Sequence, residues 1–226
     1  MSWTITPQTK VPVDPFRSQV SLLLHGDGTN GSTTITDSSP TPKTVTAFGN
    51  AQISTAQSKF GGSSIAFDGT GDYLTTSQNN DFTVGTGDFT IEFWVWVPAI
   101  PTTGFPAICI SNSATPINQL FINFRNNNTI ALTTGFSVFA VSPGIAASTW
   151  SHIAVVRSSG NTVAYTQGIG GSPVACSIDF AGNAFFIGGA ASGNWINGYI
   201  DDFRITKGVA RYTSNFTPPT APFPDI

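Results

Sequence analysis

The chain has 226 residues, with 40% hydrophobic and only 9% charged side chains, and a formal net charge of −3. This length and apolar content suit one domain with a sizeable core. Nine basic residues without a basic cluster exclude a typical nucleic-acid-binding surface. Because no run of about 18 apolar residues occurs, no membrane span is expected. Sparse charge opposes association only weakly, so the composition favours a subunit of a homo-oligomeric assembly.

The first segment, residues 1–17, is polar and is interrupted by three prolines. Proline at this frequency blocks both a helix and a central strand. The isolated apolar residues of the segment are Trp3, Val11, Val13 and Phe16. We predict an extended arm that docks on another subunit and attaches the protein there. The segment also lacks the apolar run of a signal peptide, so synthesis in a host cytoplasm without this export route is expected.

The chain from residue 18 to residue 207 alternates short apolar runs with turn residues. Helical periodicity of useful length is absent, and Gly, Pro, Asn or Asp follows most of the runs. Many short strands with frequent turns are typical of a β-sandwich. The expected strands cover residues 20–25, 45–48, 51–54, 64–67, 73–76, 89–97, 107–110, 119–124, 129–133, 137–141, 152–157, 162–166, 173–179, 184–187 and 199–206.

Two of these strands have faces of different character. In residues 89–97 the odd-numbered positions are all apolar, whereas the even-numbered ones carry a threonine, a glutamate and two tryptophans. In residues 198–206, strict alternation places Phe203 on one face and Asp202 beside Arg204 on the other. We therefore expect a buried Phe203 and an Asp202–Arg204 ion pair.

Five stretches carry a family resemblance: SLLLHGDG at 21–28, KFGGSSIAFDGTGDYLTT at 59–76, DFTIEFWVWV at 88–97, WSHIAVVRSSGNTVAYTQG at 150–168 and WINGYIDDFRITKGVARYTSNFTPPTAPFP at 195–224. They resemble laminin-G-like domains of the concanavalin A-like lectin/glucanase superfamily, in particular those found in bacteriophage virion proteins. The resemblance implies an all-β, two-sheet jelly-roll β-sandwich over residues 18–207, with adjacent first and last strands. The proline-rich tail, residues 208–226, is expected to pack on this sandwich.

Catalysis is not expected. A glycosidase needs two carboxyl groups at a set separation, and retaining enzymes of the resembled superfamily carry paired glutamates on one strand. Glu92 is the only glutamate of the chain. The two histidines, His25 and His152, lie in framework strands, and no GxSxG motif occurs. A polysaccharide-degrading enzyme remains an alternative, because an aspartate pair can perform inverting hydrolysis.

A structural calcium ion is a second hypothesis, because the resemblance implies a rim site built from aspartates. Hard oxygen ligands in loops suit calcium. The candidate ligands are Asp27, Asp37, Asp201 and Asp202, which converge if the first and last strands pair. The alternative is that they serve ordinary turns and framework ion pairs.

Glycan binding is a third hypothesis, since sugars stack on aromatic rings and bind amide and charged groups. The candidate contacts are Trp94, Trp96, Trp195, Arg125 and Asn127. Packing of the first two tryptophans against a neighbouring strand or the tail is the alternative.

The sequence thus predicts a non-enzymatic module on the surface of a bacteriophage virion, in its tail, fibre or capsid. Its expected partners are other virion proteins and a host-surface glycan, and a bacterial surface adhesin remains an alternative. Cys109 and Cys176 lie in apolar strand contexts and are expected to be buried free thiols. A single bridge between them is the other possibility.

Overall fold

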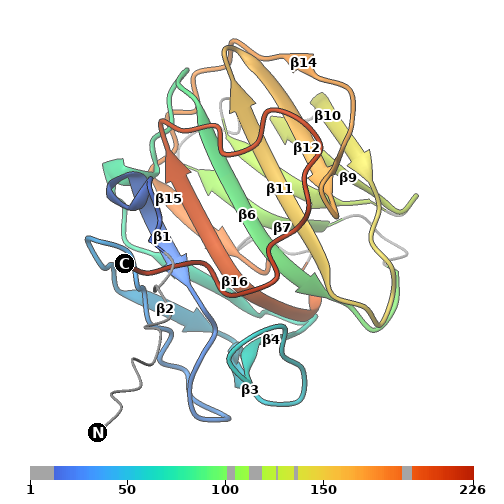
Figure 1. Ribbon diagram of the computed structural model, residues 1–226. Coiled ribbons are helices and arrows are strands. Elements are labelled where there is room, and N and C mark those ends of the chain that lie inside the picture. The colour runs from blue at the N-terminus through green and yellow to red at the C-terminus, as the bar shows by residue number, and fades with distance from the viewer. Residues whose placement is uncertain (1–12, 101–104, 112–118, 126, 135–136, 190–194) are drawn as a thin grey trace, which may run out of the picture.

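The computed structural model describes residues 13–100, 105–111, 119–125, 127–134, 137–189 and 195–226 (Figure 1). Two antiparallel sheets pack face to face, which confirms the predicted all-β concanavalin A-like sandwich. Helical structure within these ranges is confined to two short 3₁₀ turns, η1 (Arg17–Gln19) and η2 (Asn80–Phe82). None of the described helices is long and apolar enough to cross a membrane.

The larger sheet, sheet A, has the strand order β13-β12-β11-β6-β16-β4-β3, with β1 paired to β16 and β14 to β12. Its strands are β1 (Val20–Leu24), β3 (Gln52–Ser54), β4 (Ser64–Asp68), β6 (Phe89–Trp96), β11 (Ser151–Ser158), β12 (Asn161–Thr166), β13 (Ile169–Gly170), β14 (Val174–Ala175) and β16 (Asn197–Lys207). The pairing of β1 with β16 confirms that the first and last strands are adjacent.

The second sheet, sheet B, has the strand order β10-β9-β8-β7-β15-β5-β2. Its strands are β2 (Val45–Phe48), β5 (Tyr73–Thr76), β7 (Phe105–Ser111), β8 (Leu120–Phe124), β9 (Thr129–Thr134), β10 (Ser137–Pro143) and β15 (Ala184–Ile187). The expected strand at residues 173–179 is reduced to the two residues of β14, which pair with β12.

The core lies between the sheets and contains the apolar face of β6. Its odd-numbered residues are buried there, as predicted. Phe203 is fully buried and stacks on Phe93 of β6, with ring centroids 5.7 Å apart. Across the sandwich, its centroid lies 5.2 Å from that of Phe185 on sheet B. Aromatic contacts between the layers therefore join the two sheets.

A β-bulge in β16 overturns the predicted alternation of that strand. Its register against β6 shifts between Asp201 and Arg204, and Asp202 has a φ of 46°. Aspartate tolerates this left-handed conformation better than most residues. Ile200 and Phe203 consequently both point into the core although they are three residues apart. The predicted Asp202–Arg204 pair is wrong, because the bulge directs the two side chains to different partners.

The tail, residues 208–226, crosses the outer face of sheet A (Figure 1). Phe216 stacks on Tyr212 and packs against Tyr165 of β12. Phe223 is 3% exposed and packs on β1 beside Leu23. Aromatic side chains of the tail thus cover part of the face that a sandwich would otherwise leave open to solvent.

The end of the predicted arm is part of this domain. Trp3 and Val11 lie outside the described residues, and Val13 and Phe16 are 63% and 38% exposed. Between them, Asp14 is buried, and its backbone N–H donates to the carbonyl of Ile226 at 2.9 Å. Asp14 therefore contacts the domain, although it lies within the predicted arm of residues 1–17.

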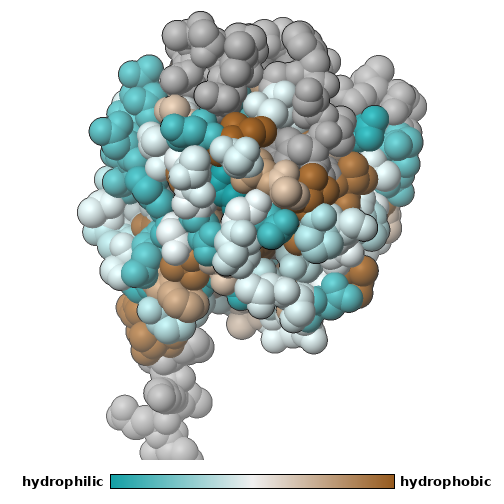
Figure 2. All heavy atoms as spheres, turned by 90° about the horizontal axis from the view of Figure 1, so that it is seen from above, coloured by the Kyte–Doolittle hydropathy of each residue, from teal (hydrophilic) through white to brown (hydrophobic). Residues whose placement is uncertain are grey.

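The surface is polar although it carries few charges. On the face seen from above, white and teal residues predominate and brown residues form small separate groups between them (Figure 2). Inside, Cys176 is a buried free thiol, so the possible bridge to Cys109 is not formed.

Candidate functional site

One end of the outer face of sheet A is left open by the tail and has a continuous row of side chains. Trp96 of β6 pairs with Tyr199 of β16, Tyr199 pairs with Ala66 of β4, and Ala66 pairs with Gln52 of β3. The neighbours of these residues along each strand point into the core. Alternation therefore directs all four side chains outward. The row has aromatic rings at one end, a methyl group in the middle and an amide at the other end.

This row forms the floor of a groove of about 510 Å³. Such a volume lies within the range typical of small-molecule sites. The groove is lined by Asn50, Gln52, Ala66, Phe67, Asp68, Asp72, Trp96, Pro98, Asn197 and Tyr199. The small side chain of Ala66 keeps the middle of the floor low, so the larger residues on either side form its walls.

The aromatic wall depends on a close approach of two strands. The Trp96 and Tyr199 rings are both half-buried, with centroids 5.5 Å apart and planes at 72°. A Cβ atom at Gly198 would lie 2.3 Å from the carbonyl oxygen of Trp96. Only glycine permits this approach, which places Tyr199 edge to face against the indole.

The polar wall is fixed from below by a buried carboxylate. Asp72 is fully buried, and its two oxygens accept the backbone N–H groups of Asn50 and Asp68. Above it, the Asn50 amide donates to Oδ2 of Asp68 at 3.1 Å, and both side chains are exposed. Asn197 is exposed opposite Asp68 in the strand pairing. Asp72 thus serves the turn, while amide and carboxylate groups remain exposed in the groove.

The arrangement suits recognition of a polyhydroxylated ring. An aromatic surface offers an apolar face on which a sugar ring can stack. The amides of Asn50, Gln52 and Asn197 supply both donors and acceptors, and Asp68 supplies a further acceptor. Among the five predicted glycan contacts, only Trp96 lies in this groove.

Trp94 points to the same face of β6 as Trp96, but it is not available to a ligand. It is 3% exposed, and the Lys59 ammonium lies 3.9 Å from its ring centroid. Phe60 packs on it edge to face at 5.9 Å. The backbone N–H groups of Lys59 and Phe60 donate to one oxygen of Asp201, which holds this loop over the indole. The alternative that this tryptophan packs against its neighbours is therefore the correct one.

The other predicted contacts are separated from the groove. Trp195 is half-buried immediately before β16 and is not among the residues that line the groove. Arg125 and Asn127 flank the turn between β8 and β9 on sheet B. The Asn127 side chain accepts a bond from Thr129 at 2.7 Å, so it stabilises its own turn. Register between distant strands, which the sequence does not display, would have been needed to find Tyr199 and Gln52.

The four predicted calcium ligands do not converge. Within the described ranges, no group of three or more His, Cys, Asp or Glu side chains is placed to hold a metal ion. Asp37 is buried and accepts backbone N–H groups of Leu23, Ser39 and Lys43. Its carboxylate therefore fixes the loop after β1, although β1 and β16 pair as expected.

The remaining aspartates also have separate surroundings. Asp27 is exposed, whereas Asp201 and Asp202 are fully buried. Burial raises the pKa of Asp201 to about 7, because its two backbone donors only partly offset the lost hydration. Asp202 accepts from the backbone N–H of Phe223 at 2.8 Å, and its other oxygen lies 2.8 Å from Nδ1 of His25. These contacts hold the tail and the end of β1.

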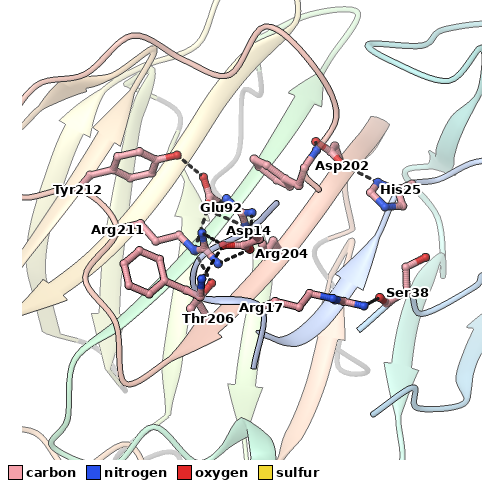
Figure 3. Close-up of polar contacts among 12 residues, drawn as sticks. Asp14, Arg17, His25, Ser38, Glu92, Asp202, Arg204, Thr206, Arg211 and Tyr212 are labelled. Atoms are coloured by element: carbon pink, nitrogen blue, oxygen red, sulfur yellow. Dashed lines mark hydrogen bonds and ion pairs between the residues drawn. The ribbon is translucent and has the colours of Figure 1, made fainter. Parts of the chain in front are cut away.

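A buried ionic network lies beneath the tail on the same face (Figure 3). Arg204 donates to Glu92 at 2.7 and 3.0 Å and to Asp14 at 3.2 Å. Arg211 donates to Asp14 at 2.7 and 3.0 Å, and the Tyr212 hydroxyl donates to Glu92 at 2.8 Å. Residues from the N-terminal end, the sheet and the tail thus meet in one cluster.

The network controls the ionisation of Glu92. Burial opposes its charged form, but the positive charge of Arg204 and the contact with His152 outweigh burial and lower its pKa to about 2. Nε2 of His152 lies 3.4 Å from Oε2 of Glu92. A carboxylate held ionised and fully buried in this way is a structural counterion, and it is not placed to protonate a ligand.

Comparisons with known proteins identify the family. A laminin-G family model, described as the concanavalin A-like lectin/glucanases superfamily, matches residues 68–211. No curated protein sequence matches the chain. Similarity to solved structures extends over most of the chain at low identity, and the chain spans a third to a half of their length.

One similar structure is the botulinum neurotoxin serotype D binding domain, with a TM-score of 0.66, 15% identity, and coverage of 86% of this chain and 49% of that one. A botulinum neurotoxin DC binding domain in complex with SialylT has a TM-score of 0.58, 18% identity, and coverage of 92% and 49%. Trypanosoma rangeli sialidase in complex with sialic acid has a TM-score of 0.63, 12% identity, and coverage of 90% and 33%. At these identities the likeness concerns the fold alone. The family match extends over well more than half of the chain, which therefore belongs to the concanavalin A-like lectin/glucanases superfamily.

Proposed function

We propose that this protein is a non-enzymatic carbohydrate-binding module on the surface of a bacteriophage virion, and that the groove beside Trp96 and Tyr199 binds a host-surface glycan. The observation that carries the proposal is the groove itself. An aromatic wall, a low floor and a wall of exposed amides meet there on one face of a lectin-like sheet. This combination of a stacking surface and convergent polar groups is what a sugar ligand requires.

The similar structures support glycan binding as the role. Two of them are complexes with SialylT and with sialic acid. Another is a botulinum neurotoxin DC binding domain in complex with rat synaptotagmin II, of which the chain covers 50%. In this chain the polar and aromatic lining of the groove favours the glycan.

The carboxylates support a binding role over a catalytic one. Glu92 is fully buried in ion pairs. In the groove, both oxygens of Asp72 accept backbone N–H groups, which leaves Asp68 as the one exposed carboxylate among the described lining residues. Glycoside hydrolysis needs a second carboxyl group free to act as acid, base or nucleophile. If the chain were the alternative polysaccharide-degrading enzyme, purified protein would release reducing ends from the polysaccharide that it binds.

Two features of the sequence support the virion location: its composition, and the resemblance of its five stretches to laminin-G-like domains of bacteriophage virion proteins. Few charges suit a subunit packed within an assembly. Antibodies against the sandwich are expected to label intact phage particles in electron micrographs. Labelling of bacterial surfaces in the absence of phage would instead favour the alternative of a bacterial adhesin.

The binding proposal is tested on a panel of bacterial surface polysaccharides and defined oligosaccharides. Wild-type protein is expected to retain at least one member of the panel, and Trp96→Ala is expected to abolish retention. Ile169→Ala removes an apolar side chain that is 52% exposed on β13, at the other end of sheet A, and serves as the matched control. Unchanged binding by Trp96→Ala would place the glycan site elsewhere.

A further inference from the structure

We infer that the groove selects an oligosaccharide that is neutral or carries amino groups, and that it rejects acidic sugars. The inference rests on the proposed function and specifies the ligand of the same site. It follows from the charges that line the groove and from the length of the row across the four strands.

The described lining of the groove includes two carboxylates, Asp68 and Asp72, and no Lys, Arg or His. The sequence also has no basic residue in segments 101–104 or 190–194, which follow Pro98 and precede Asn197. Recognition of a sugar carboxylate normally uses arginine or lysine, because burying an unpaired anion beside other anions is unfavourable. The local charge of the groove therefore disfavours uronic and sialic acids.

Asp68 is the residue through which this charge would act on a ligand. It is exposed, and its two oxygens accept one bond each, from the Thr70 backbone N–H at 2.7 Å and from the Asn50 amide at 3.1 Å. An ionised carboxylate can accept about four hydrogen bonds. Asp68 therefore has capacity to accept hydroxyl groups or to pair with an ammonium group. Asp72 has no such role because it is buried beneath the turn.

Lys59 lies over the row of sheet A beside the groove, and it has another role. Its ammonium lies over the Trp94 ring at 3.9 Å. Trp94 pairs with Asp201, whereas Trp96 pairs with Tyr199, so the lysine sits over the neighbouring row of the sheet. The lysine is not among the lining residues of the groove, and the lining residues that the structure describes include no other basic side chain that could pair with their negative charge.

The row from Trp96 to Gln52 crosses four adjacent strands. At about 4.8 Å between neighbouring strands, this gives a floor roughly 14 Å long. A floor of this length accommodates more than one sugar ring. The preferred ligand is therefore an oligosaccharide, and a monosaccharide would contact only one end of the groove.

The inference is tested with oligosaccharides that share a backbone and carry different charged groups. Pentamers on β-1,3-, β-1,4- and α-1,4-glucan backbones are prepared in three forms: unmodified, with 2-amino groups, and with 6-carboxylates. Binding to the full chain is measured by calorimetry at low and high salt. On a backbone that binds, the neutral and amino forms are expected to bind at least about tenfold more tightly than the carboxylate form. Added salt should weaken only the amino form.

Variants assign this selectivity to the groove. Asp68→Asn removes the charge with little change in shape and is expected to weaken the amino form about tenfold. Binding of the neutral form should stay within about threefold of wild type. Asp179→Asn alters an exposed carboxylate outside the groove and should change neither affinity.

The possible outcomes separate this inference from the proposed function. If the carboxylate form binds as well as the neutral form, and Trp96→Ala abolishes both, the groove is the glycan site and the charge selectivity is wrong. If binding survives Trp96→Ala, the proposed site fails and the inference fails with it. If none of the pentamers binds although the panel of polysaccharides retains wild-type protein, the inferred ligand class is wrong and the proposed site stands. Both are supported if the wild-type protein prefers the neutral and amino forms, Trp96→Ala abolishes binding, and Asp68→Asn weakens the amino form selectively.

Discussion

The outer face of sheet A uses polar side chains in two opposite ways. Beneath the tail, Glu92, Arg204 and Asp14 are buried, and they form ion pairs with one another and with the partly buried Arg211. At the open end of the same face, the amides and Asp68 surround a groove and keep exposed hydrogen-bonding groups. The first region holds three segments of the chain together, and the second leaves its polar groups available to a ligand.

The difference shows how one face of a sheet can carry both a buried ionic network and a binding site. The tail covers the part of the face that carries the ionic network, and the charged groups there are satisfied by one another instead of by water. Aromatic residues of the tail cover this part. Among them, Phe223 lies against Arg204, with the guanidinium 3.8 Å from the ring centroid. The groove region remains uncovered, so we expect stability and ligand binding to respond to different substitutions.

The largest expected effect comes from the centre of the buried network. Arg204→Ala leaves Glu92 and Asp14 as buried carboxylates that have lost a shared partner. Breaking a buried ion pair on one side typically costs about 3–5 kcal/mol. Chemical denaturation should show a loss of this size in the free energy of unfolding.

A control on the same strand makes this result specific. Lys207→Ala removes a partly exposed cation at the end of β16 and should cost less than about 1 kcal/mol. Glycan affinity of the folded Arg204→Ala protein should equal that of wild type. A loss of affinity in this variant would show that the two regions of the face are coupled.

The next largest effect is a loss in the free energy of unfolding at low pH. Glu92 has a pKa of about 2 in the folded protein, against an ordinary value of 4.5. Because the folded pKa is lowered, its contribution is complete above pH 4.5 and is lost as the pH falls toward 2. The loss is on the order of 3 kcal/mol.

Asp201 acts in the opposite direction and must be separated from Glu92. Its folded pKa is raised to about 7 from 3.8, so its ionisation destabilises the folded protein as the pH rises from about 4 to 7. Denaturation of Asp201→Asn between pH 2 and 7 should retain the acid loss and lack the decline toward neutral pH. An unchanged profile below pH 4.5 in Glu92→Gln would show that another group causes the acid loss.

The sequence predicts the sandwich well because hydrophobic alternation reports directly on burial. The five odd-numbered residues of 89–97 form the core face as expected. Alternation also placed Trp94 and Trp96 on the outer face, but it could not predict that Trp94 is buried while Trp96 is partly exposed. Trp94 is buried because a distant loop, anchored on Asp201, covers it.

The remaining errors have the same origin in contacts between distant residues. The bulge at Asp202 reverses which residues of β16 face the core beyond it, and the sequence of that strand does not predict the bulge. The groove combines Gln52, Ala66, Trp96 and Tyr199 from four strands, so it exists only once their register is known. The buried network was missed because its members are up to 197 residues apart.

The smallest expected effect concerns the N-terminal boundary of the domain. Removing residues 1–12 should leave the buried network intact, whereas removing residues 1–17 also deletes Asp14 and its bonds to Arg204 and Arg211. Hydrogen bonds to charged groups contribute about 1.5–3 kcal/mol, and Glu92 remains to pair with Arg204. We therefore expect the free energy of unfolding of the longer truncation to be about 2 kcal/mol lower than that of the shorter one.

Asp14→Asn in the full chain should reproduce most of this loss, because the amide keeps the shape of the carboxylate but not its charge. Equal stability of the two truncated proteins would show that the network is self-sufficient without Asp14, and that the domain begins only after residue 17.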